Sequence, residues 1–462
     1  MRKNPTSGAS PVPVLGTARG RERCRPPRFL LACLETCRLL VDLMPGPVVT
    51  VITPSYNQGR FIRATIESVL SQNYPHLEYI VMDGGSTDET AAVVKEYSSR
   101  LAFISEKDRG QSHAINKGFQ MARGSVLAWL NSDDLYLPGS IAAAVEAFTR
   151  NPAAGAVYGE GYLIDSAGKS PSRFPWTQAF DLWRLTHLSD YILQQTVFFR
   201  RNALDEVGYL DENLHYTMDW DILIRLGKKY PLVYIPEYMA CLREYPEAKT
   251  FAGGSRRVSE IRSMLSRHTG MLVSPGYVVY GLDTYHQILC RKVDRLFLPR
   301  LPFVAEKLRW LISYTVGKIV SRTVRESQGL YADGWAGPIL RYMLPAGSGD
   351  LTFEGSLPNS DGFRGQQVCI SANGLSLGQF QLSPGDFYLT VPLPPELESQ
   401  LLNLRIKAAR SAAFVPGPAD GDSRRLAYLL KSIRRANTPG DMRSEKSSPT
   451  PPISTSAESL PL

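Results

Sequence analysis

The hydrophobic and polar positions between residues 48 and 233 alternate short β-branched runs with helical periods. Such alternation is typical of a mostly parallel sheet covered by helices. The runs that we expect to form strands are VVTVIT (48–53), LEYIVMD (77–83), LAFISE (101–106), SVLAWL (125–130) and VYGEGYLI (157–164). Two stretches between them repeat apolar residues at spacings of three and four, which predicts amphipathic helices at 62–72 and 88–99.

The pattern changes twice after residue 255. Residues 256–328 have helical periods with breaks at Pro275, Pro299 and Pro302. From 335 to 415, short alternating segments are separated by Gly, Pro and Asn-Gly turns, which predicts a small antiparallel β-sandwich with a hairpin at Asn373-Gly374. We therefore expect a disordered basic extension (1–46), an α/β domain (47–255), a helical segment (256–333), a β-sandwich accessory domain (334–435) and a disordered tail (436–462).

Charge and cysteine usage narrow the class of protein. The net charge is +8, but residues 1–46 alone hold eight Lys/Arg against three Asp/Glu, and the rest is close to balanced. No basic stripe is interleaved with aromatic residues, so we expect no nucleic-acid partner. The six cysteines form no CxxC pair and have no histidine at metal-ligand spacing, which favours unpaired thiols in a reducing compartment.

The N-terminal residues resemble a secretory signal only superficially. The apolar run FLLACL is followed by Glu35, Arg38 and Asp42, which interrupt the region that a signal needs. We interpret residues 1–43 as an upstream extension, because Met44 directly precedes the first predicted strand. No uncharged apolar run reaches about eighteen residues, so a membrane-spanning helix is not expected.

Three of the predicted strands end in polar loops, and ligands bind at the carboxyl edge of a parallel sheet. The loops are Thr53-Pro54-Ser55-Tyr56-Asn57, Asp83-Gly84-Gly85-Ser86-Thr87-Asp88 and Asn131-Ser132-Asp133-Asp134. Structural explanations remain open for each, since residues 86–88 can cap the next helix and residues 56–57 can form a turn.

The neighbouring carboxylates Asp133 and Asp134 are the strongest chemical signal. Adjacent carboxylates at the end of a buried strand repel each other unless a cation lies between them. A divalent cation with oxygen ligands, Mn²⁺ or Mg²⁺, would relieve that repulsion and bridge the phosphates of a nucleotide. The alternative is a solvated acid pair in the loop before Pro138.

Read in order, TPSYNQGRFI, DGGSTDET, DRGQSHAINKGFQMARG, LNSDD and MDWDILIRL resemble the inverting family 2 glycosyltransferases with a GT-A fold. The similarity covers residues 47–245. It implies transfer of a sugar from a nucleotide-diphosphate donor to an acceptor hydroxyl, with inversion at the anomeric carbon. By position, it implies contacts to the donor nucleotide from Pro54, Tyr56, Asn57, Asp83, Ser86 and Asp133, to the donor sugar from Asp108 and Asn116, and to the metal from Asp133 and Asp134.

The metal motif departs from the family pattern, because Asn131 stands where the first acid of Asp-x-Asp is usual. An amide can still accept from a ribose hydroxyl or bind through its carbonyl oxygen. Metal dependence is expected on this basis, with Asp133 as the principal ligand.

Inverting transfer also needs a base that removes the proton of the acceptor hydroxyl, and a carboxylate suits this role. Asp219 is our candidate base on motif position. Asp221 is expected to cap the helix or to pair with Arg225. The alternative is that both acids are ordinary acidic residues in the first turn of a helix. Weaker candidates for acceptor or phosphate contact are Gln194, Asp221, Arg225 and Arg200, and we expect His113 to be an ordinary helix residue.

Several features bear on the acceptor. Processive relatives carry several membrane spans and a Gln-x-x-Arg-Trp segment, and neither occurs here, which favours transfer of a single sugar. We expect a glycan or lipid-linked acceptor in cell-surface polysaccharide or glycolipid assembly, and a cytoplasmic enzyme at the inner face of the membrane. The stretch 303–325 would touch the membrane surface or pack on the catalytic domain.

Two other functions stay open at this point. A nucleotidyltransferase shares an α/β sheet and an acidic metal site, although TPSYNQGRF is a poor match to its basic phosphate loop. The other open function is a non-catalytic carbohydrate-binding protein with a glycosyltransferase-like core. The aromatic residues of the sandwich would then stack on sugars rather than fill its core, namely Trp335, Phe363, Phe380, Phe387 and Tyr388.

Overall fold

The computed structural model describes residues 46–245, 247–249, 253–298, 301–330, 334–357, 365–409, 412–413 and 425–435. Contacts divide the chain into two units, Met1–Gly46 and Pro47–Leu462. All the helices and strands named below belong to the second unit. The predictions for the N-terminal extension, the C-terminal tail, Pro299 and Phe363 lie outside the described residues.

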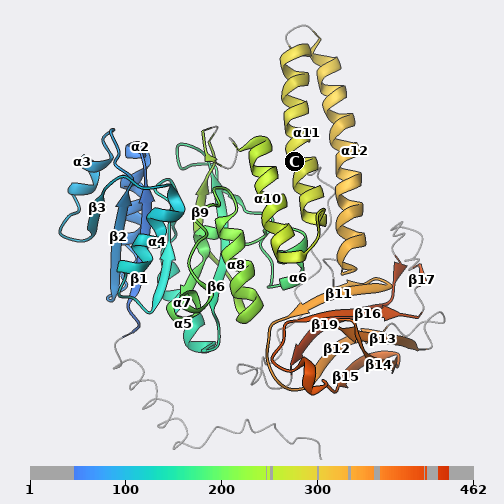
Figure 1. Cartoon of the computed structure of the whole chain (residues 1–462). Coiled ribbons are helices and arrows are strands. Elements are labelled where there is room, and N and C mark those ends of the chain that lie inside the picture. The colour runs from blue at the N-terminus through green and yellow to red at the C-terminus, as the bar shows by residue number, and fades with distance from the viewer. Residues whose placement is uncertain are drawn as a thin grey trace, which may run out of the picture. The chain divides into compact units, whose positions relative to one another are not determined.

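A nine-stranded sheet has the spatial order β3-β2-β1-β4-β8-β6-β9-β5, with β7 paired to β6. Strands β3, β2 and β1 lie at one end of it, and β6 and β9 lie side by side farther along (Figure 1). Its strands are β1 Val49–Ser55, β2 Leu77–Asp83, β3 Ala102–Ser105, β4 Val126–Trp129, β5 Leu135–Tyr136, β6 Ala156–Ile164, β7 Ser172–Arg173, β8 Phe198–Arg200 and β9 Leu232–Arg243. The five predicted strands are therefore present.

The expectation of a mostly parallel sheet is wrong beyond β4. Strands β3, β2, β1 and β4 are mutually parallel, and β9 is parallel to β6. Strand β8 pairs antiparallel with both β4 and β6, and β5 pairs antiparallel with β9. The result is a mixed GT-A-like sheet, in which the short β8 lies antiparallel between β4 and β6 and the short β5 is the edge strand beside β9. Antiparallel neighbours need no helical crossover.

Helices cover both faces of this sheet, namely α2 Gly59–Leu70, α3 Thr90–Lys95, α4 Gln111–Met121, α5 Ser140–Arg150, α6 Leu182–His187, α7 Arg201–Val207 and α8 Met218–Lys229, with the 3-10 turn η1 at Gln194–Thr196. The period of two in β1 separates two cores. Val49 and Val51 pack with Ile62 of α2 in one core, whereas Ile52 packs with Phe119 of α4 in the other. Alternate residues of one strand therefore hold helices on opposite faces.

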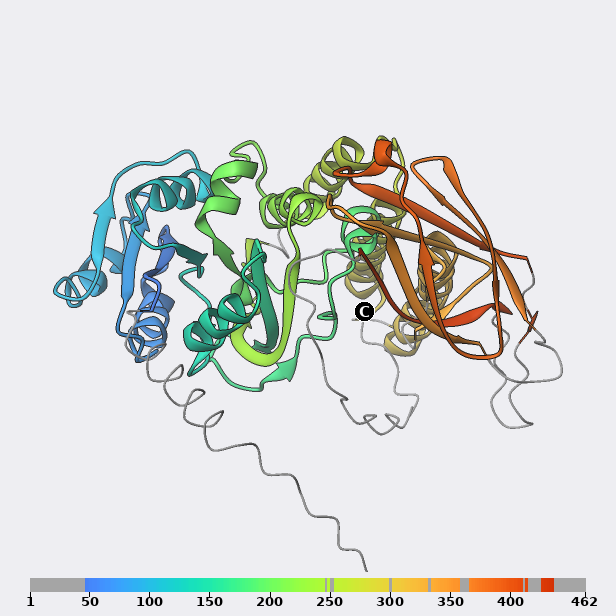
Figure 2. The same cartoon turned by 90° about the horizontal axis from the view of Figure 1, so that it is seen from below.

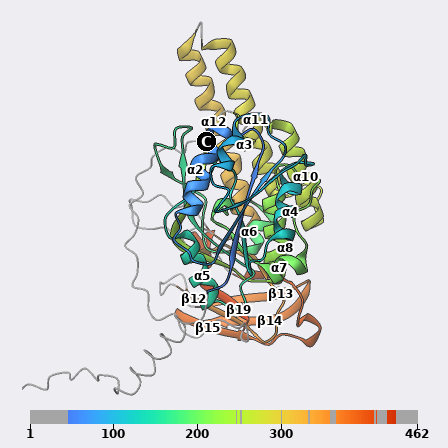
Figure 3. The same ribbon diagram turned by 90° about the vertical axis from the view of Figure 1, so that its left-hand side faces the viewer.

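Three helices follow, α10 Gly254–Thr269, α11 Pro275–Phe297 and α12 Pro302–Gln328. The prolines predicted as breaks begin α11 and α12, where a missing N–H costs nothing. Ser274 caps α11 by accepting the N–H of Tyr277. Helix α10 is part of the α/β domain's core through Ile261, while α11 and α12 form an antiparallel pair (Figure 3).

The predicted β-sandwich is confirmed as two antiparallel sheets, β10-β19-β12-β15 and β11-β16-β13-β14 (Figure 2). Its elements are β10 Trp335–Ala336, β11 Ile339–Leu344, β12 Leu351–Leu357, β13 Gln366–Ala372, β14 Leu375–Leu382, β15 Gly385–Val391, η2 Pro395–Leu397, β16 Leu402–Ala408 and β19 Tyr428–Arg435, with β17 Ala412–Ala413 paired to β18 Arg425–Leu426. Asn373 and Gly374 turn between β13 and β14 with φ of 51° and 86°, which confirms the hairpin.

The aromatic residues of the sandwich mostly serve its own packing. Phe380 and Phe387 pack against the sandwich core, and the Phe387 ring lies 6.2 Å from that of Tyr428. Tyr388 is exposed. Met343 of β11 belongs to a small apolar cluster with Trp183 of α6, so the sandwich also contacts the α/β domain.

Candidate active site

The first two polar loops are tied to each other. Asn57, just after β1, adopts a left-handed backbone with φ of 52°. Its side-chain oxygen accepts the N–H of Thr87 at 2.8 Å, and its own N–H donates to the Ser86 hydroxyl at 2.7 Å. Pro54 is buried in β1, whereas the Tyr56 ring is 62% exposed. The loops therefore form one rigid polar surface from which an aromatic ring projects.

Asp83 ends β2 as a carboxylate that is only 2% exposed. Ser86 donates both its N–H, at 3.0 Å, and its hydroxyl to this carboxylate. The Ser105 hydroxyl of β3 donates to it at 2.6 Å. These contacts fix the orientation of the group. Sequence analysis missed Ser105, because a serine at the end of a strand gives no signal beyond ordinary turn chemistry.

Asp88 links the starts of two helices. One carboxylate oxygen accepts the N–H of Thr90 in α3 at 3.0 Å, and the other accepts the N–H of Gly59 in α2 at 2.9 Å. Burial alone would raise the pKa of Asp88, but these hydrogen bonds outweigh it and the pKa lies below its ordinary value. Helix capping, which the sequence left open for residues 86–88, is therefore the role of Asp88.

Asp134, in the loop between β4 and β5, is enclosed by hydrogen-bond donors. Its carboxylate accepts hydrogen bonds from the N–H of Arg243 at 2.9 Å, Nε2 of Gln195 at 2.7 Å and Nδ2 of Asn131 at 3.1 Å. The side chain is 1% exposed. Burial, followed by the negative charge of Asp133, raises the pKa of Asp134 above its ordinary value. Both oxygens are thus engaged in holding β9 and η1 to the end of β4.

Asp133 has a more open environment. It is partly exposed, and its Oδ2 accepts the hydroxyl of Tyr245 at 2.6 Å. The described residues give Oδ1 no hydrogen-bond donor. Its backbone carbonyl accepts Nε of Arg243 at 2.8 Å, and that guanidinium lies 4.8 Å from the centre of the Phe61 ring. Of the two neighbouring carboxylates, Asp133 is the one that a ligand can reach.

Sequence analysis did not find Arg243 and Tyr245. They lie at and just after the end of β9, more than 100 residues from the aspartates that they contact. Their only signal was an Arg-x-Tyr pair after an apolar run. That pattern is too common to distinguish a site residue from a strand end.

A chain of polar contacts connects the end of β4 with the start of α8. The side-chain oxygen of Asn131 accepts Nε2 of Gln111 at 2.7 Å. Gln111 Oε1 in turn accepts Nζ of Lys249 at 2.8 Å. Burial raises the pKa of Asp219, and the positive charge of Lys249 opposes that rise. Asn131 therefore takes part in a hydrogen-bond path that ends at Lys249, a cation that acts on the candidate base through its charge.

Asp219 lies in the first turn of α8 and is partly exposed. Its Oδ1 accepts the N–H of Trp220 at 2.9 Å. A second carboxylate, Asp190, lies beside it, and burial followed by the negative charge of Asp219 raises the pKa of Asp190. Burial also raises the pKa of Asp219, against the opposing charges of Lys249 and Arg257. Asp190 was missed because a single Asp after Ser189 gives no signal beyond ordinary loop chemistry.

Asp221 has a structural environment. Its Oδ2 accepts Nε of Arg225 at 2.7 Å, and its Oδ1 lies 2.8 Å from Nε2 of His268. Burial would raise the pKa of Asp221, but the His268 hydrogen bond and the Arg225 charge hold it below its ordinary value. Arg225 also donates to three carbonyls of residues 207–209. The pairing with Arg225 is one of the two alternatives that the sequence left open.

Asp108 approaches the second polar loop closely. A Cβ placed on Gly84 would lie 2.7 Å from Oδ2 of Asp108, so only glycine fits beside this carboxylate. The other oxygen of Asp108 accepts the N–H of Gly110 at 2.8 Å, just before α4. The carboxylate thus lies against the loop that carries Asp83.

Asn116 and Gln194 use their amides within the protein. Asn116 donates to the carbonyl of Leu210 at 2.9 Å and accepts its N–H at 3.0 Å. Gln194 donates to the carbonyl of Trp129 at 2.9 Å. Both side chains are buried. These contacts position neighbouring segments, and they do not bring either amide to the surface.

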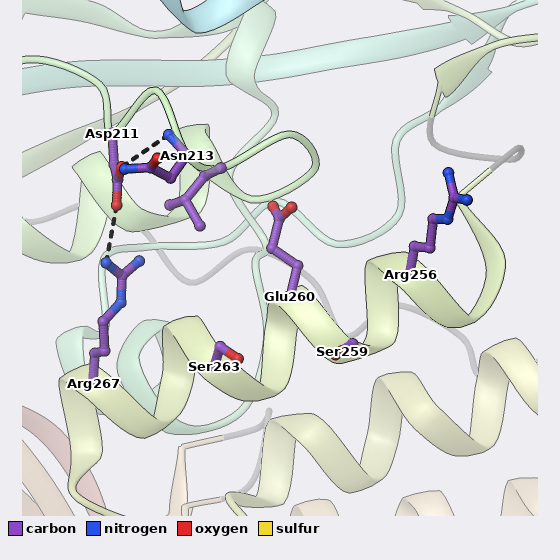
Figure 4. Close-up of a pocket in the computed structure, with 8 residues that line it drawn as sticks. Asp211, Asn213, Arg256, Ser259, Glu260, Ser263 and Arg267 are labelled. Atoms are coloured by element: carbon purple, nitrogen blue, oxygen red, sulfur yellow. Dashed lines mark hydrogen bonds and ion pairs between the residues drawn. The ribbon is translucent and has the colours of Figure 1, made fainter.

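Helix α10 holds the segment that precedes Asp219. Glu260 accepts the backbone N–H groups of His215, Tyr216 and Thr217 at 3.0, 2.7 and 2.9 Å. The carboxylate borders a depression of about 530 Å³ in which Arg267 pairs with Asp211 (Figure 4). Glu260 therefore caps the approach to α8 and fixes the start of the helix that carries the candidate base.

The structure shows two further facts about the described residues. No three His, Cys, Asp or Glu side chains among them gather as a group that would hold a metal ion. None of the described helices is long and apolar enough to cross a membrane.

The strand order and the acidic loops at one edge of the sheet define a GT-A-like α/β domain. Residues 50–208 match the family model described as Glycosyl transferase family 2. The chain therefore contains a family 2 glycosyltransferase domain. This match favours a glycosyltransferase over a nucleotidyltransferase.

Similar proteins carry the same class name. The chain is 29% identical over 183 residues to the Uncharacterized glycosyltransferase RP339 of Rickettsia prowazekii, covering 38% of this chain and 58% of that protein. It is 29% identical over 209 residues to a PGL/p-HBAD biosynthesis glycosyltransferase of Mycobacterium bovis, covering 44% and 79%. Among solved structures, the mannosyltransferase PcManGT from Pyrobaculum calidifontis is 19% identical with a TM-score of 0.40, covering 64% of this chain and 91% of that one.

Proposed function

We propose that this glycosyltransferase moves a single sugar from a nucleotide-diphosphate sugar to an acceptor hydroxyl, with inversion at the anomeric carbon. The observation that supports this most is the hydrogen-bonded path from Asn131 through Gln111 to Lys249, whose positive charge acts on Asp219 against the pKa-raising effect of burial. It connects the predicted donor edge with a cation that acts on the predicted base through its charge. Single displacement requires the donor and the base to meet the acceptor at one place.

The nucleotide is proposed to lie along the loops after β1 and β2. Pro54, Tyr56 and Asn57 would line its pocket, and Ser86 would hold the loops around it. The buried carboxylate of Asp83, already fixed by Ser86, would accept the N–H of a nucleobase. Uracil and thymine present the same imide N–H to such a group, so UDP and dTDP sugars both fit this contact.

Mn²⁺ or Mg²⁺ is proposed to bind at Asp133. Its Oδ1 receives no donor from the described residues, whereas both oxygens of Asp134 are engaged. A single carboxylate fits a cation that takes its remaining oxygen ligands from the donor's phosphates and from water. Bound there, the cation would neutralise charge on the departing diphosphate. We therefore assign the metal to Asp133 and a supporting role to Asp134.

Asp219 is proposed as the base. Burial raises its pKa, and a carboxylate of raised pKa is a stronger proton acceptor when ionised. Asp108, beside Gly84, is proposed to contact the donor sugar. The remaining candidates would act through position, Asn116 on the Leu210 segment and Gln194 on the end of β4.

The acceptor is proposed to be a glycan or a lipid-linked precursor at the cytoplasmic face of the membrane. The mycobacterial relative is named for PGL/p-HBAD biosynthesis, which supports a role in assembly rather than breakdown. Asp221 and Arg225 would shape this region through the 207–209 turn. The β-sandwich is proposed as an accessory domain without a catalytic residue.

A donor panel tests the proposal. The full chain is incubated with UDP, dTDP and GDP sugars, with and without Mn²⁺. Release of the nucleoside diphosphate and the stereochemistry of the product are measured. We expect one donor class to be consumed and a product of inverted anomeric configuration with natural or soluble acceptors. Retention of configuration would overturn the single-displacement mechanism. Failure of every nucleotide sugar would overturn the donor assignment.

A further inference from the structure

The outer parts of α11 and α12, residues 285–298 and 301–319, form a pair that we call the outer hairpin. Its helices contact each other through polar groups. His286 Nε2 lies 2.8 Å from the Ser313 hydroxyl, and Arg309 pairs with Asp294 at 3.3 Å. Only small or single apolar groups, such as Ala305, are fully buried between them. The internal seam of the hairpin is thus unusually polar.

The outward surface of the hairpin is unusually apolar. Eleven of the exposed large hydrophobic side chains of the described residues belong to it. They are Tyr285, Leu289, Leu296, Leu298, Leu301, Phe303, Val304, Trp310, Leu311, Tyr314 and Ile319. Exposing so many large apolar side chains to water on one pair of helices is unfavourable, and such a concentration marks an interaction site.

One stripe of α12 combines aromatic and cationic side chains. Phe303, Lys307, Trp310, Tyr314 and Lys318 recur at spacings of three and four, which places them on one face. The Trp310 and Tyr314 rings stack with centroids 5.3 Å apart. Lys307 lies 5.5 Å from the centre of the Phe303 ring. Lysine ammonium groups therefore flank apolar rings along the whole stripe.

The hairpin also concentrates positive charge. Residues 285–298 and 301–319 contain six Lys/Arg and two Asp/Glu. Arg291, Lys292 and Arg295 of α11 are exposed near the apolar end. Two copies of so basic a surface repel each other, whereas an anionic surface attracts it. Charge therefore distinguishes between the two occupants that an apolar surface would otherwise accept.

We propose that the outer hairpin docks the enzyme onto an anionic phospholipid surface. Leu296, Leu301 and Phe303 enter the boundary between headgroups and acyl chains. Trp310 and Tyr314 lie at headgroup level, where amphipathic rings are favoured, and the Lys/Arg side chains meet lipid phosphates. Sugar polymers would use the rings and the cations, but they offer nothing to the aliphatic side chains at the end of the hairpin.

The base of the hairpin is fixed beside the candidate active site. Tyr280 of α11 accepts the N–H of Asp190 at 3.2 Å, and its ring lies 5.2 Å from that of Trp220. From Tyr280 to Leu296 the helix rises about 24 Å, at 1.5 Å per residue. The same helix therefore connects the surroundings of Asp219 with the proposed lipid contact. This geometry suits an acceptor that extends from a membrane toward the enzyme.

Vesicle co-sedimentation of the full chain tests the proposal. The vesicles are pure phosphatidylcholine, or phosphatidylcholine with 30% phosphatidylglycerol. The variant is L296S/L301S/F303S, whose three sites are exposed, and the matched control is W176S/L375S/Y388S, exposed sites outside the hairpin. We expect the full chain and the control to bind the anionic vesicles. The hairpin variant should bind at least about tenfold more weakly, and binding should weaken as salt rises.

A second measurement locates the contact. Tryptophan emission is quenched by brominated lipid, and W310F should lose most of that quenching while keeping vesicle binding within about threefold. Equal vesicle affinity of the hairpin variant and the full chain would overturn the proposal. So would a full chain that ignores both vesicle types but forms a dimer that the variant cannot form, since a second copy would then be the occupant.

Transfer to a soluble acceptor separates this inference from the proposed function. The hairpin variant should keep that activity within about twofold, because none of its substituted side chains lies in the described active site. Loss of vesicle binding with intact transfer supports docking. Intact vesicle binding in an enzyme that consumes no donor would overturn the proposed function and leave the docking surface standing.

Discussion

The carboxyl edge of the nine-stranded sheet and the C-terminal β-sandwich use polar residues in opposite ways. The edge buries two carboxylates, Asp83 and Asp134, and surrounds them with donors. No Asp or Glu side chain is buried in the described part of the sandwich, whose strands alternate apolar and polar positions. Burying a carboxylate costs stability unless it is paired, so its presence indicates a site, whereas regular alternation indicates a scaffold.

The largest effect expected at the edge is on turnover. Asp219→Asn keeps the shape of the side chain but cannot accept a proton at neutral pH. We expect kcat to fall by roughly a hundredfold or more, with donor affinity unchanged. Single-turnover kinetics and calorimetry with the donor measure the two quantities. The control Glu146→Gln removes one exposed charge on α5 and should change neither.

A variant that loses donor affinity but turns over normally at saturation would place Asp219 in the donor-binding shell. The difference between the acidic edge of the sheet and the sandwich would still hold, but another group would have to be the base. Asp190, beside Asp219, would then be the next candidate.

The second effect concerns the neighbouring carboxylates at the end of β4. Asp133→Ala should weaken donor binding in Mn²⁺ by roughly 10–100-fold, because one charged contact contributes about 1.5–3 kcal/mol. Its folding stability should change little, since the side chain is partly exposed and has one hydrogen-bond partner. Calorimetry with and without Mn²⁺ measures the first, and thermal unfolding the second.

Asp134→Ala is the matched comparison. It leaves the donors from Arg243, Gln195 and Asn131 without their acceptor, and each unsatisfied buried group costs about 1–3 kcal/mol. We expect a clear fall in the unfolding temperature. Equal unfolding temperatures for the two alanine variants would contradict the structural role of Asp134.

The third effect is on pH dependence. Asp219 must be ionised to accept a proton, and its raised pKa makes activity fall, as pH decreases, at a higher pH than an ordinary Asp would. Lys249→Met removes a positive charge that opposes the raised pKa of Asp219, and it should therefore move the acidic limb of kcat/KM to higher pH. At pH 7 the change should stay under about tenfold, one pKa unit being 1.36 kcal/mol. An unmoved limb would show that Lys249 does not act on the base.

The smallest effect is expected in the sandwich. Tyr388→Ala removes its exposed ring and should alter transfer to a soluble acceptor by less than about twofold, because surface substitutions away from a site change little. Assays with soluble and natural acceptors measure this. A loss of activity confined to the natural acceptor would indicate that the sandwich is a glycan-binding module. A loss of activity with both acceptors would contradict the view that the sandwich is only a scaffold.

Sequence patterns predicted the local features well and the long-range ones poorly. Strands β1, β2 and β4 and the Asn373-Gly374 turn depend on periodicity and turn chemistry within a few residues. The antiparallel insertion of β8, and the contacts of Arg243 and Tyr245 with Asp133, join residues far apart in the chain. Periodicity does not encode which distant segments meet, because many pairings bury similar apolar area. The roles of Asp133 and Asp134 differ only through such distant partners.

Glu260 accepts the backbone N–H groups of residues 215–217, and this affects the order in which the parts of the site form during translation. The strands and loops proposed to bind the donor are complete once β9 has emerged. The backbone before Asp219 still lacks its acceptor until α10 follows. A nascent chain therefore gains its nucleotide pocket before it gains a fixed base. Premature stops between β9 and α10 would also remove Ile261 from the core, so such proteins should lose stability as well as a fixed base.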